Sequence, residues 1–169
     1  ERVVDQIKDR YNEQLFHSTL LEERYKQTSN IIFGSVDSAD LDIILPVLSM
    51  CYPKGNKDLI KKNTQIIFVP HEINSKLITK LVNKLKAYNF DFDFLYTNDN
   101  SNKKLIASES KTLIVNKVGI LAELYQYCQF AYIGGGFSRG VHSIIEPAIY
   151  DCIISHGPNI HILTEAQEM

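Results

Sequence analysis

The sequence predicts an α/β fold with a doubly wound, mostly parallel sheet of about six strands and helices on both faces. Three observations predict it: short runs that are apolar throughout, helical patterns between them, and small or polar residues directly after each run. Strands that are apolar throughout are typical of parallel sheets covered on both faces. With 169 residues, the chain is long enough for one such domain.

The predicted strands are the apolar runs bounded by turn residues, at 31–33, 65–69, 92–96, 112–115, 130–133 and 152–155. Helices are predicted between them, where apolar residues recur three and four positions apart, at 41–48, 77–85, 119–127 and 144–150. The segments 54–62 and 98–104 are polar, and we expect solvated loops there. Residues 1–29 are polar with apolar residues at roughly helical spacing, so we expect a separate N-terminal helical arm or linker.

Composition excludes several classes of protein. The chain has 44% hydrophobic and 22% charged residues, a net charge of −2 and no long block of one sign, which provides no electrostatic case for a nucleic-acid partner. No apolar run approaches the roughly 18 residues of a membrane span. Cys51, Cys128 and Cys152 are isolated, so we expect buried thiols at the last two and neither a disulfide framework nor a metal site. Isolated cysteines of this kind are typical of a reducing cytosol. We expect no cofactor.

The stretch from Ile133 to Pro147 is the most informative one. An apolar strand breaks into Gly134–Gly136, and Arg139, His142 and Glu146 follow. Glycines let the backbone approach a ligand closely, and a helix beginning there would offer N–H groups to a phosphate. A helix would also place His142 and Glu146 on one face. The stretch therefore outlines a nucleotide site, with donors for phosphate and a carboxylate for sugar hydroxyls.

Other interpretations of this stretch remain open. Ser143 and Glu146 have the spacing of a capping box, which would make Glu146 a structural group. A generic glycine turn is also possible. A G-x-G-x-x-G dinucleotide loop is not expected, because that motif needs glycine where the chain has Arg139.

Small and polar residues follow the predicted strands. In doubly wound sheets, ligands bind at the carboxyl ends of the strands. Each of these loops alone is compatible with an ordinary strand-to-helix connection. Their joint placement at one edge predicts a site there, formed by 34–35, 70–72, 116–119, 134–142 and 156–159.

These residues resemble the C-terminal half of 3-deoxy-D-manno-octulosonic acid (Kdo) transferases. The specific part is Tyr132–Phe137, Gly140-x-His142, Ile145–Pro147 and His156–Asn159; looser matches are Phe33–Ser35, Val69–Glu72, Val118-Gly119 and Leu124-Tyr125. The resemblance covers about residues 30–168. Kdo transferases are GT-B glycosyltransferases that move Kdo from CMP-Kdo onto a lipid A precursor in lipopolysaccharide biosynthesis. The resemblance implies that residues 30–169 form the Rossmann-like CMP-Kdo-binding domain of a GT-B fold. It also implies truncation at the C-terminus, inside a helix that begins near Ile160.

The resemblance also implies the roles of individual residues. The substrate-binding set would be Ser35, His71, Gly119, Gly135, Gly136, Arg139, His142, Glu146 and Asn159, with no metal. No catalytic residue is expected in this chain, because the base, the lipid A precursor site and the membrane association belong to the family's N-terminal half. The full-length protein would act as a peripheral protein at the cytoplasmic face of the bacterial inner membrane, and this chain alone would be inactive.

Two departures from the family affect the expected donor contacts. The family often has Pro-Arg-His at Pro70-His71-Glu72, and Asp-Thr-x-Gly-Glu at 116–120, where this chain reads Asn-Lys-Val-Gly-Ile. One cationic contact and one carboxylate are therefore in question. The alternatives are an epimerase-like GT-B domain acting on nucleotide sugars, and a non-catalytic nucleotide-binding or interaction domain. Lys76, Lys80 and Lys84 share one predicted helix face, either a solvated face or a contact for anionic lipid.

Overall fold

The computed structural model describes residues 25–95 and 109–161. Four predicted segments lie wholly or mostly outside the described residues, or end outside them. They are the N-terminal arm, the end of the strand predicted at 92–96, the loop predicted at 98–104 and the helix predicted from Ile160 onward.

Six parallel strands form one sheet in the order β3-β4-β2-β1-β5-β6. The strands are β1 (Ser29–Val36), β2 (Thr64–Pro70), β3 (Phe92–Phe94), β4 (Thr112–Ile114), β5 (Phe130–Ile133) and β6 (Ile153–His156). β1 and β2 occupy the centre, and every residue of β2 is buried, as expected for a strand covered on both faces. The predicted doubly wound, parallel sheet is confirmed.

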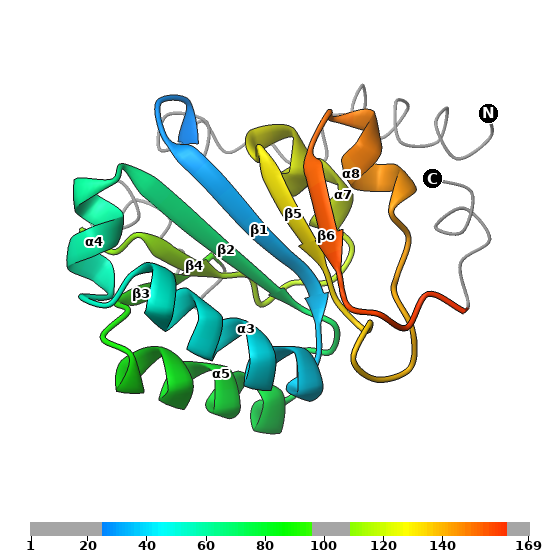
Figure 1. The fold of residues 1–169 in the computed structure, drawn as a ribbon, viewed down its shortest axis with the longest axis horizontal. Coiled ribbons are helices and arrows are strands. Elements are labelled where there is room, and N and C mark those ends of the chain that lie inside the picture. The colour runs from blue at the N-terminus through cyan, green and yellow to red at the C-terminus, as the bar shows by residue number, and fades with distance from the viewer. Residues whose placement is uncertain (1–24, 96–108, 162–169) are drawn as a thin grey trace.

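The helices divide between the two faces of this sheet (Figure 1). One face carries α3 (Ser38–Cys51), α4 (Asn56–Lys61) and α5 (Ser75–Ala87), which bury a core with Phe33 and Phe68. We call it the long-helix face. The other carries α7 (Leu121–Leu124), the 3₁₀ helix η2 (Tyr125–Tyr127) and α8 (Ile145–Ile149), which pack over Ile32 and Ile67. We call it the short-helix face.

The two long helices follow directly from their sequences. In α5, Leu77, Leu81 and Leu85 recur every four residues and are buried, and the Asn74 side chain accepts a hydrogen bond from the Leu77 N–H at 2.8 Å. Such a cap satisfies one of the donors that the first turn of a helix leaves unpaired. In α3, Leu41, Ile44, Leu45 and Leu48 face the sheet in the same way. Both predicted helices are confirmed.

Three predicted segments differ from the structure. The segment 54–62 is not a loop, because Asn56–Lys61 forms α4 and inserts Leu59, which is fully buried, into the core. One apolar anchor in six residues leaves no periodicity to detect. The helix predicted at 119–127 is replaced by the short α7 and the 3₁₀ turn η2. The strand predicted at 31–33 continues through Gly34 to Val36 with a bulge, where Ser35 has φ of 52°.

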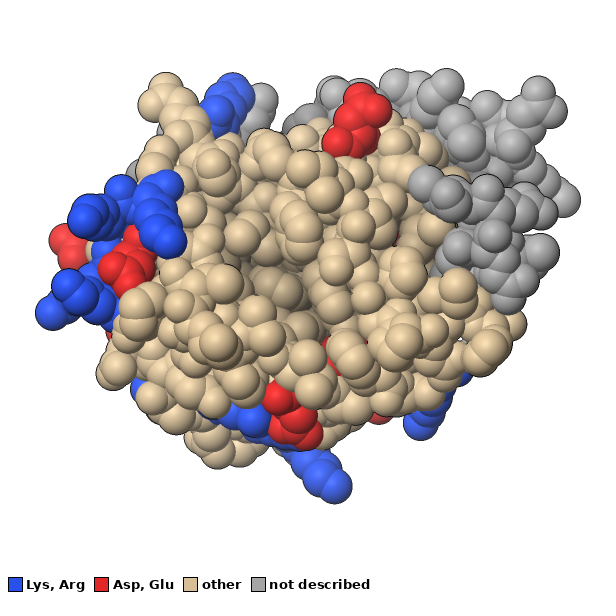
Figure 2. Space-filling model, in the orientation of Figure 1, with Lys and Arg blue, Asp and Glu red and all other residues tan. Residues whose placement is uncertain are grey.

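On the face that Figure 2 draws, basic and acidic side chains both lie along the lower edge, toward which β1 and β2 end. Lysines gather over α4, at the side of the molecule where β2 begins (Figure 2); they are Lys54, Lys57, Lys61 and Lys62. Cys128 and Cys152 are buried free thiols, as predicted, and burial raises the pKa of Cys152 to about 11. Among the described residues, no helix is both long and apolar enough to cross a membrane.

Candidate functional site

A pocket of about 530 Å³ lies where the carboxyl ends of β1, β2 and β5 meet. In Figure 1 the start of α3 and the loop that follows β5 lie at this same edge. Four of the predicted site residues line the pocket: His71, Gly135, Arg139 and His142. The rest of the lining comes from residues outside the predicted substrate-binding set: Asp37, Ser38, Ala39, Asn74, Lys76, Leu77 and Lys80, together with Glu72 and Ser138, which belong to loops predicted at this edge.

Two histidines from distant parts of the chain meet in the pocket. The rings of His71, after β2, and His142, after β5, are stacked with centroids 4.4 Å apart and planes inclined by 26°. Burial lowers the pKa of His142 below its ordinary value, and the neighbouring His71 lowers it further, while Asp40 and Asp37 act in the opposite direction. His142 therefore favours its neutral form, in which one ring nitrogen donates and the other accepts a hydrogen bond.

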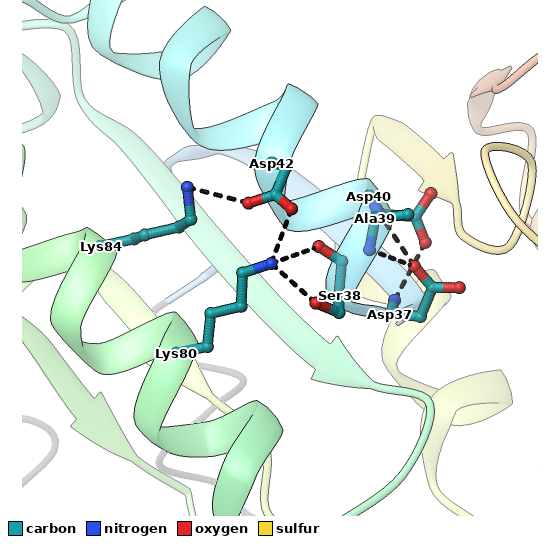
Figure 3. A network of polar contacts seen from close by, with 7 residues as sticks. All are labelled: Asp37, Ser38, Ala39, Asp40, Asp42, Lys80 and Lys84. Carbon is teal, nitrogen blue, oxygen red and sulfur yellow. Dashed lines mark hydrogen bonds and ion pairs between the residues drawn. The ribbon is translucent and has the colours of Figure 1, made fainter.

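Three cationic side chains border the pocket. Lys80 is already engaged, because its Nζ lies 2.7 Å from Asp42 Oδ2 and donates to both oxygens of Ser38 (Figure 3). Lys76 and Arg139 are exposed, and neither forms an ion pair within the described residues. These two side chains can therefore turn toward an anionic ligand. Together with the two histidines, they make the pocket suitable for a phosphate or a carboxylate.

The wall at α3 is built by a capping box of two aspartates. Asp37 Oδ1 accepts from the backbone N–H groups of Ala39 and Asp40, at 2.8 and 3.0 Å, and Asp40 returns the bond to the Asp37 N–H (Figure 3). Burial alone would raise the pKa of Asp37, but these bonds and one from the Ser138 hydroxyl lower it. Asp37 is therefore a firmly ionised carboxylate at the rim.

The glycine loop, residues 134–140, is held by hydrogen bonds within the loop and by others to β1, to the start of α3 and to the chain after β6. Gly135 has φ of 89°, and its N–H donates to Asp40 at 2.8 Å, so this N–H is already paired within the protein. Gly136 is buried and packs closely against Gly157. A Cβ atom added at Gly136 would lie only 2.6 Å from the Gly157 Cα atom. Both glycines are needed for close backbone packing, and only Gly135 lines the pocket.

The helix predicted at 144–150 forms as α8, but it does not extend back to His142, so His142 and Glu146 do not share a helical face. Residues 141–144 are irregular, and α8 begins at Ile145, so His142 lies ahead of the helix and Glu146 in its first turn. The capping-box interpretation is also wrong, because Ile144 is the N-cap and no side chain caps the helix. Pro147 is then the third helical residue, where the missing N–H would have had no partner within the helix.

The remaining predicted site residues lie outside the pocket. Glu146 is half-buried on the short-helix face, where its charge raises the pKa of Tyr125 in addition to the larger effect of burial. Gly119 has φ of 81° and open space around it. Ser35 forms the bulge at the end of β1. Asn159 ties the chain after β6 to the glycine loop, since its side chain donates to Ser138 O at 2.9 Å and its N–H to Gly136 O at 3.0 Å.

The sequence contained a signal for the residues that were missed. Asp37 and Asp40, three positions apart between an apolar strand and a helical pattern, have the spacing and place of a capping box. At Ser143 and Glu146, which have the same spacing, no capping box forms. Tyr132 and Ser138 belong to the predicted strand and loop, but no spacing reveals their contacts, which join residues more than 90 positions apart. Among the described residues, no cluster of three or more histidine, cysteine, aspartate or glutamate side chains could hold a metal ion.

The sheet order, the glycine loop after β5 and the pocket at the carboxyl edge define a Rossmann-like α/β domain of the ligand-binding kind. Sequence comparison narrows this class, because the chain is similar to curated 3-deoxy-D-manno-octulosonic acid transferases. It is 28% identical to the Aquifex aeolicus enzyme over 142 residues, which make up 82% of this chain and 34% of that protein. It is 25% identical to the Chlamydophila psittaci enzyme over 146 residues, 85% of this chain and 30% of that protein.

The resemblance inferred from the sequence is therefore confirmed, although no family model matches the chain. The chain spans about a third of the length of these relatives. The structure is similar to a crystal structure described as the C-terminal CMP-Kdo binding domain of WaaA from Acinetobacter baumannii, with a TM-score of 0.65. That match covers 98% of this chain and 75% of the other at 13% identity, which supports the shared fold.

Proposed function

We propose that this chain is the donor-binding half of a Kdo transferase and holds CMP-Kdo at the carboxyl edge of its sheet. The observation that carries the proposal is the convergence of His71, Arg139 and His142 on one pocket beside the glycine loop. Sequence similarity to Kdo transferases over most of the chain supplies the identity of the ligand. A pocket of about 530 Å³ lies within the range of roughly 300–1,000 Å³ typical of small-molecule sites.

The pocket suits the charged part of the donor. Arg139 and Lys76 would provide positive charge to the phosphate or to the sugar carboxylate, and the two histidines would add hydrogen bonds. With the phosphate bound beside them, these donors would favour CMP as a leaving group, because they would stabilise the negative charge that develops when the bond to the sugar breaks. Glu146 would accept from the ribose hydroxyls across the sheet edge, as the resemblance implies.

The rest of the reaction belongs to the whole protein. The proposed acceptor is a lipid A precursor, held with the catalytic base by a second domain. The full-length protein would work as a peripheral protein at the cytoplasmic face of the bacterial inner membrane. The chain alone would therefore bind the donor without transferring the sugar.

Calorimetry with CMP, UMP and UDP tests the proposal, using the full-length protein. We expect CMP to bind and the two uridine nucleotides to bind at least about tenfold more weakly, a difference of about 1.4 kcal/mol. Preference for UDP would favour an epimerase-like domain, and absence of nucleotide binding would favour an interaction domain.

Arg139→Gln and Lys57→Gln form a matched pair for the same assay. Each removes one exposed positive charge, but Arg139 lines the pocket and Lys57 belongs to α4. We expect about tenfold weaker CMP binding for Arg139→Gln, since charged hydrogen bonds contribute about 1.5–3 kcal/mol, and no change for Lys57→Gln. Equal weakening of CMP binding by the two substitutions would mean that CMP binds outside this pocket.

A further inference from the structure

Asp40 is a buried carboxylate that joins three elements at the site. Its Oδ2 atom accepts from the N–H of Gly135 at 2.8 Å and from the N–H of Asp37 at 2.9 Å. Its Oδ1 atom accepts from the Tyr132 hydroxyl at 2.8 Å. Asp40 has no exposed surface and does not line the pocket, so it has no direct contact available for a ligand.

Helix capping alone does not account for these contacts. Asp37 already accepts from two N–H groups at the start of α3, and Asp40 needs only its bond to the Asp37 N–H to complete the capping box. Burying a carboxylate is unfavourable unless its oxygens are hydrogen-bonded. The bonds from Gly135 and Tyr132 lead away from α3, to the glycine loop and to β5. Asp40 therefore fixes where the loop lies relative to the helix.

Gly135 is the residue through which this constraint reaches the pocket. Its carbonyl accepts from the N–H groups of Ser138 and Gly140, at 3.0 and 2.9 Å. A Cβ atom at Gly135 would lie 3.3 Å from the His142 ring, so that ring packs directly beside the Gly135 backbone. A second tie, between the Ser138 hydroxyl and Asp37, holds the outer part of the loop to the same capping box.

We propose that Asp40 is a positioning residue for the donor site, one that places the glycine loop and, through it, His142 and Arg139. The identity of the ligand in this inference rests on the proposed function. The dependence of the loop position on Asp40 is independent of that function. Replacing the carboxylate by an amide is the sharpest change. Asparagine removes the charge: with its oxygen at the Oδ2 position it keeps both N–H bonds only as weaker, neutral ones, and with its NH₂ group there it loses both.

The first measurement needs no ligand. Amide hydrogen exchange in the full-length protein should show faster exchange for the loop amides of Gly135, Ser138 and Gly140 in Asp40→Asn, with β1 and β2 unchanged. Tyr132→Phe is the matched control, because it removes a bond to the same carboxylate but leaves both N–H bonds in place; its loop amides should keep their protection. Unchanged loop exchange in Asp40→Asn would overturn the inference.

The second measurement is a double-mutant cycle on CMP binding. We expect Asp40→Asn to weaken binding about tenfold in the parent protein and less than about twofold when His142 is already alanine, because residues acting through a shared contact are not additive. Strictly additive effects would overturn the inference and leave Asp40 a stability residue. If Asp40→Asn fails to fold, Ser138→Ala takes its place, with the same non-additivity expected at a smaller size.

The two proposals fail in different ways. Absence of CMP binding by the parent protein would reject the proposed ligand, and hydrogen exchange would then decide the role of Asp40 by itself. Normal CMP binding with an unaffected loop in Asp40→Asn would reject the positioning role and leave the proposed function intact.

Discussion

The two faces of the sheet are built differently. The long-helix face is covered by α3 and α5, of 14 and 13 residues, whose side chains bury a core of leucine, isoleucine and phenylalanine. The short-helix face is covered by helical segments of four, three and five residues, with tyrosines and two cysteines in its core. Short helices are marginal by themselves and depend on tertiary packing. The long-helix face therefore provides a rigid wall for the pocket. On the short-helix face, packing against the sheet determines the conformation of the helical segments.

The largest expected effect compares matched core leucines on the two faces. Leu81 in α5 and Leu124 in α7 are both fully buried. Leu81→Ala should lower the free energy of unfolding by about 3–5 kcal/mol, because its neighbours in two long helices cannot move into the cavity. Leu124→Ala should cost about 2–3 kcal/mol, since a four-residue helix can shift. Urea unfolding measures both, and an equal or larger loss at Leu124 would contradict the contrast.

A second comparison uses two glycines with positive φ, Gly135 in the lining of the pocket and Gly119 outside it. Gly135→Ala should destabilise the protein by about 2–4 kcal/mol, because the new Cβ atom would lie 2.2 Å from Gly140 O in addition to the strained φ of 89°. Gly119→Ala should cost only about 1 kcal/mol, since its φ is 81° but nothing lies within 4 Å. Thermal unfolding distinguishes them; similar shifts would mean that the loop around Gly135 relaxes easily.

A third comparison asks whether the ligand crosses from one face to the other. We expect Glu146→Gln to weaken CMP binding about tenfold, about 1.4 kcal/mol, with little change in melting temperature, because it removes charge-assisted hydrogen bonds to the ribose. Glu72→Gln is the control, since Glu72 lines the pocket and its loss removes a negative charge near the phosphate. CMP should bind this control as tightly or more tightly. An unchanged affinity in Glu146→Gln would confine the ligand to the long-helix face.

The smallest effect expected is on the pH dependence of stability. Because the folded-state pKa of His142 is lowered below 6.5, the folded protein binds fewer protons there than the unfolded chain. Stability should therefore rise with pH through the interval that ends near 6.5 and level off above it. His142→Gln should flatten the part of this slope due to His142. Melting temperatures between about pH 5 and 8 measure the difference, and an unaltered slope would mean that this histidine does not contribute.

Sequence reasoning succeeded where a pattern is local. The strands are apolar runs, and α3 and α5 are long enough to show a helical period, so fold class and these elements were predictable. It found α8 nearly in place, but it failed at α4, whose six residues are too few for a period, and at 119–127, where a four-residue helix and a 3₁₀ turn replace the predicted helix. It also predicted that the loops would meet at one edge, because parallel strands place their carboxyl ends together.

The sequence by itself determined the fold class, the glycine loop and the resemblance to Kdo transferases, since all three depend on residues close together in the chain. Only the tertiary structure decided which candidates share a pocket. It brought His71 to His142 and kept Glu146 apart from them, on α8 and the short-helix face. It also assigned the Gly135 N–H to Asp40, a contact across 95 positions. Such contacts depend on how strands and helices pack in three dimensions, and no local spacing encodes them.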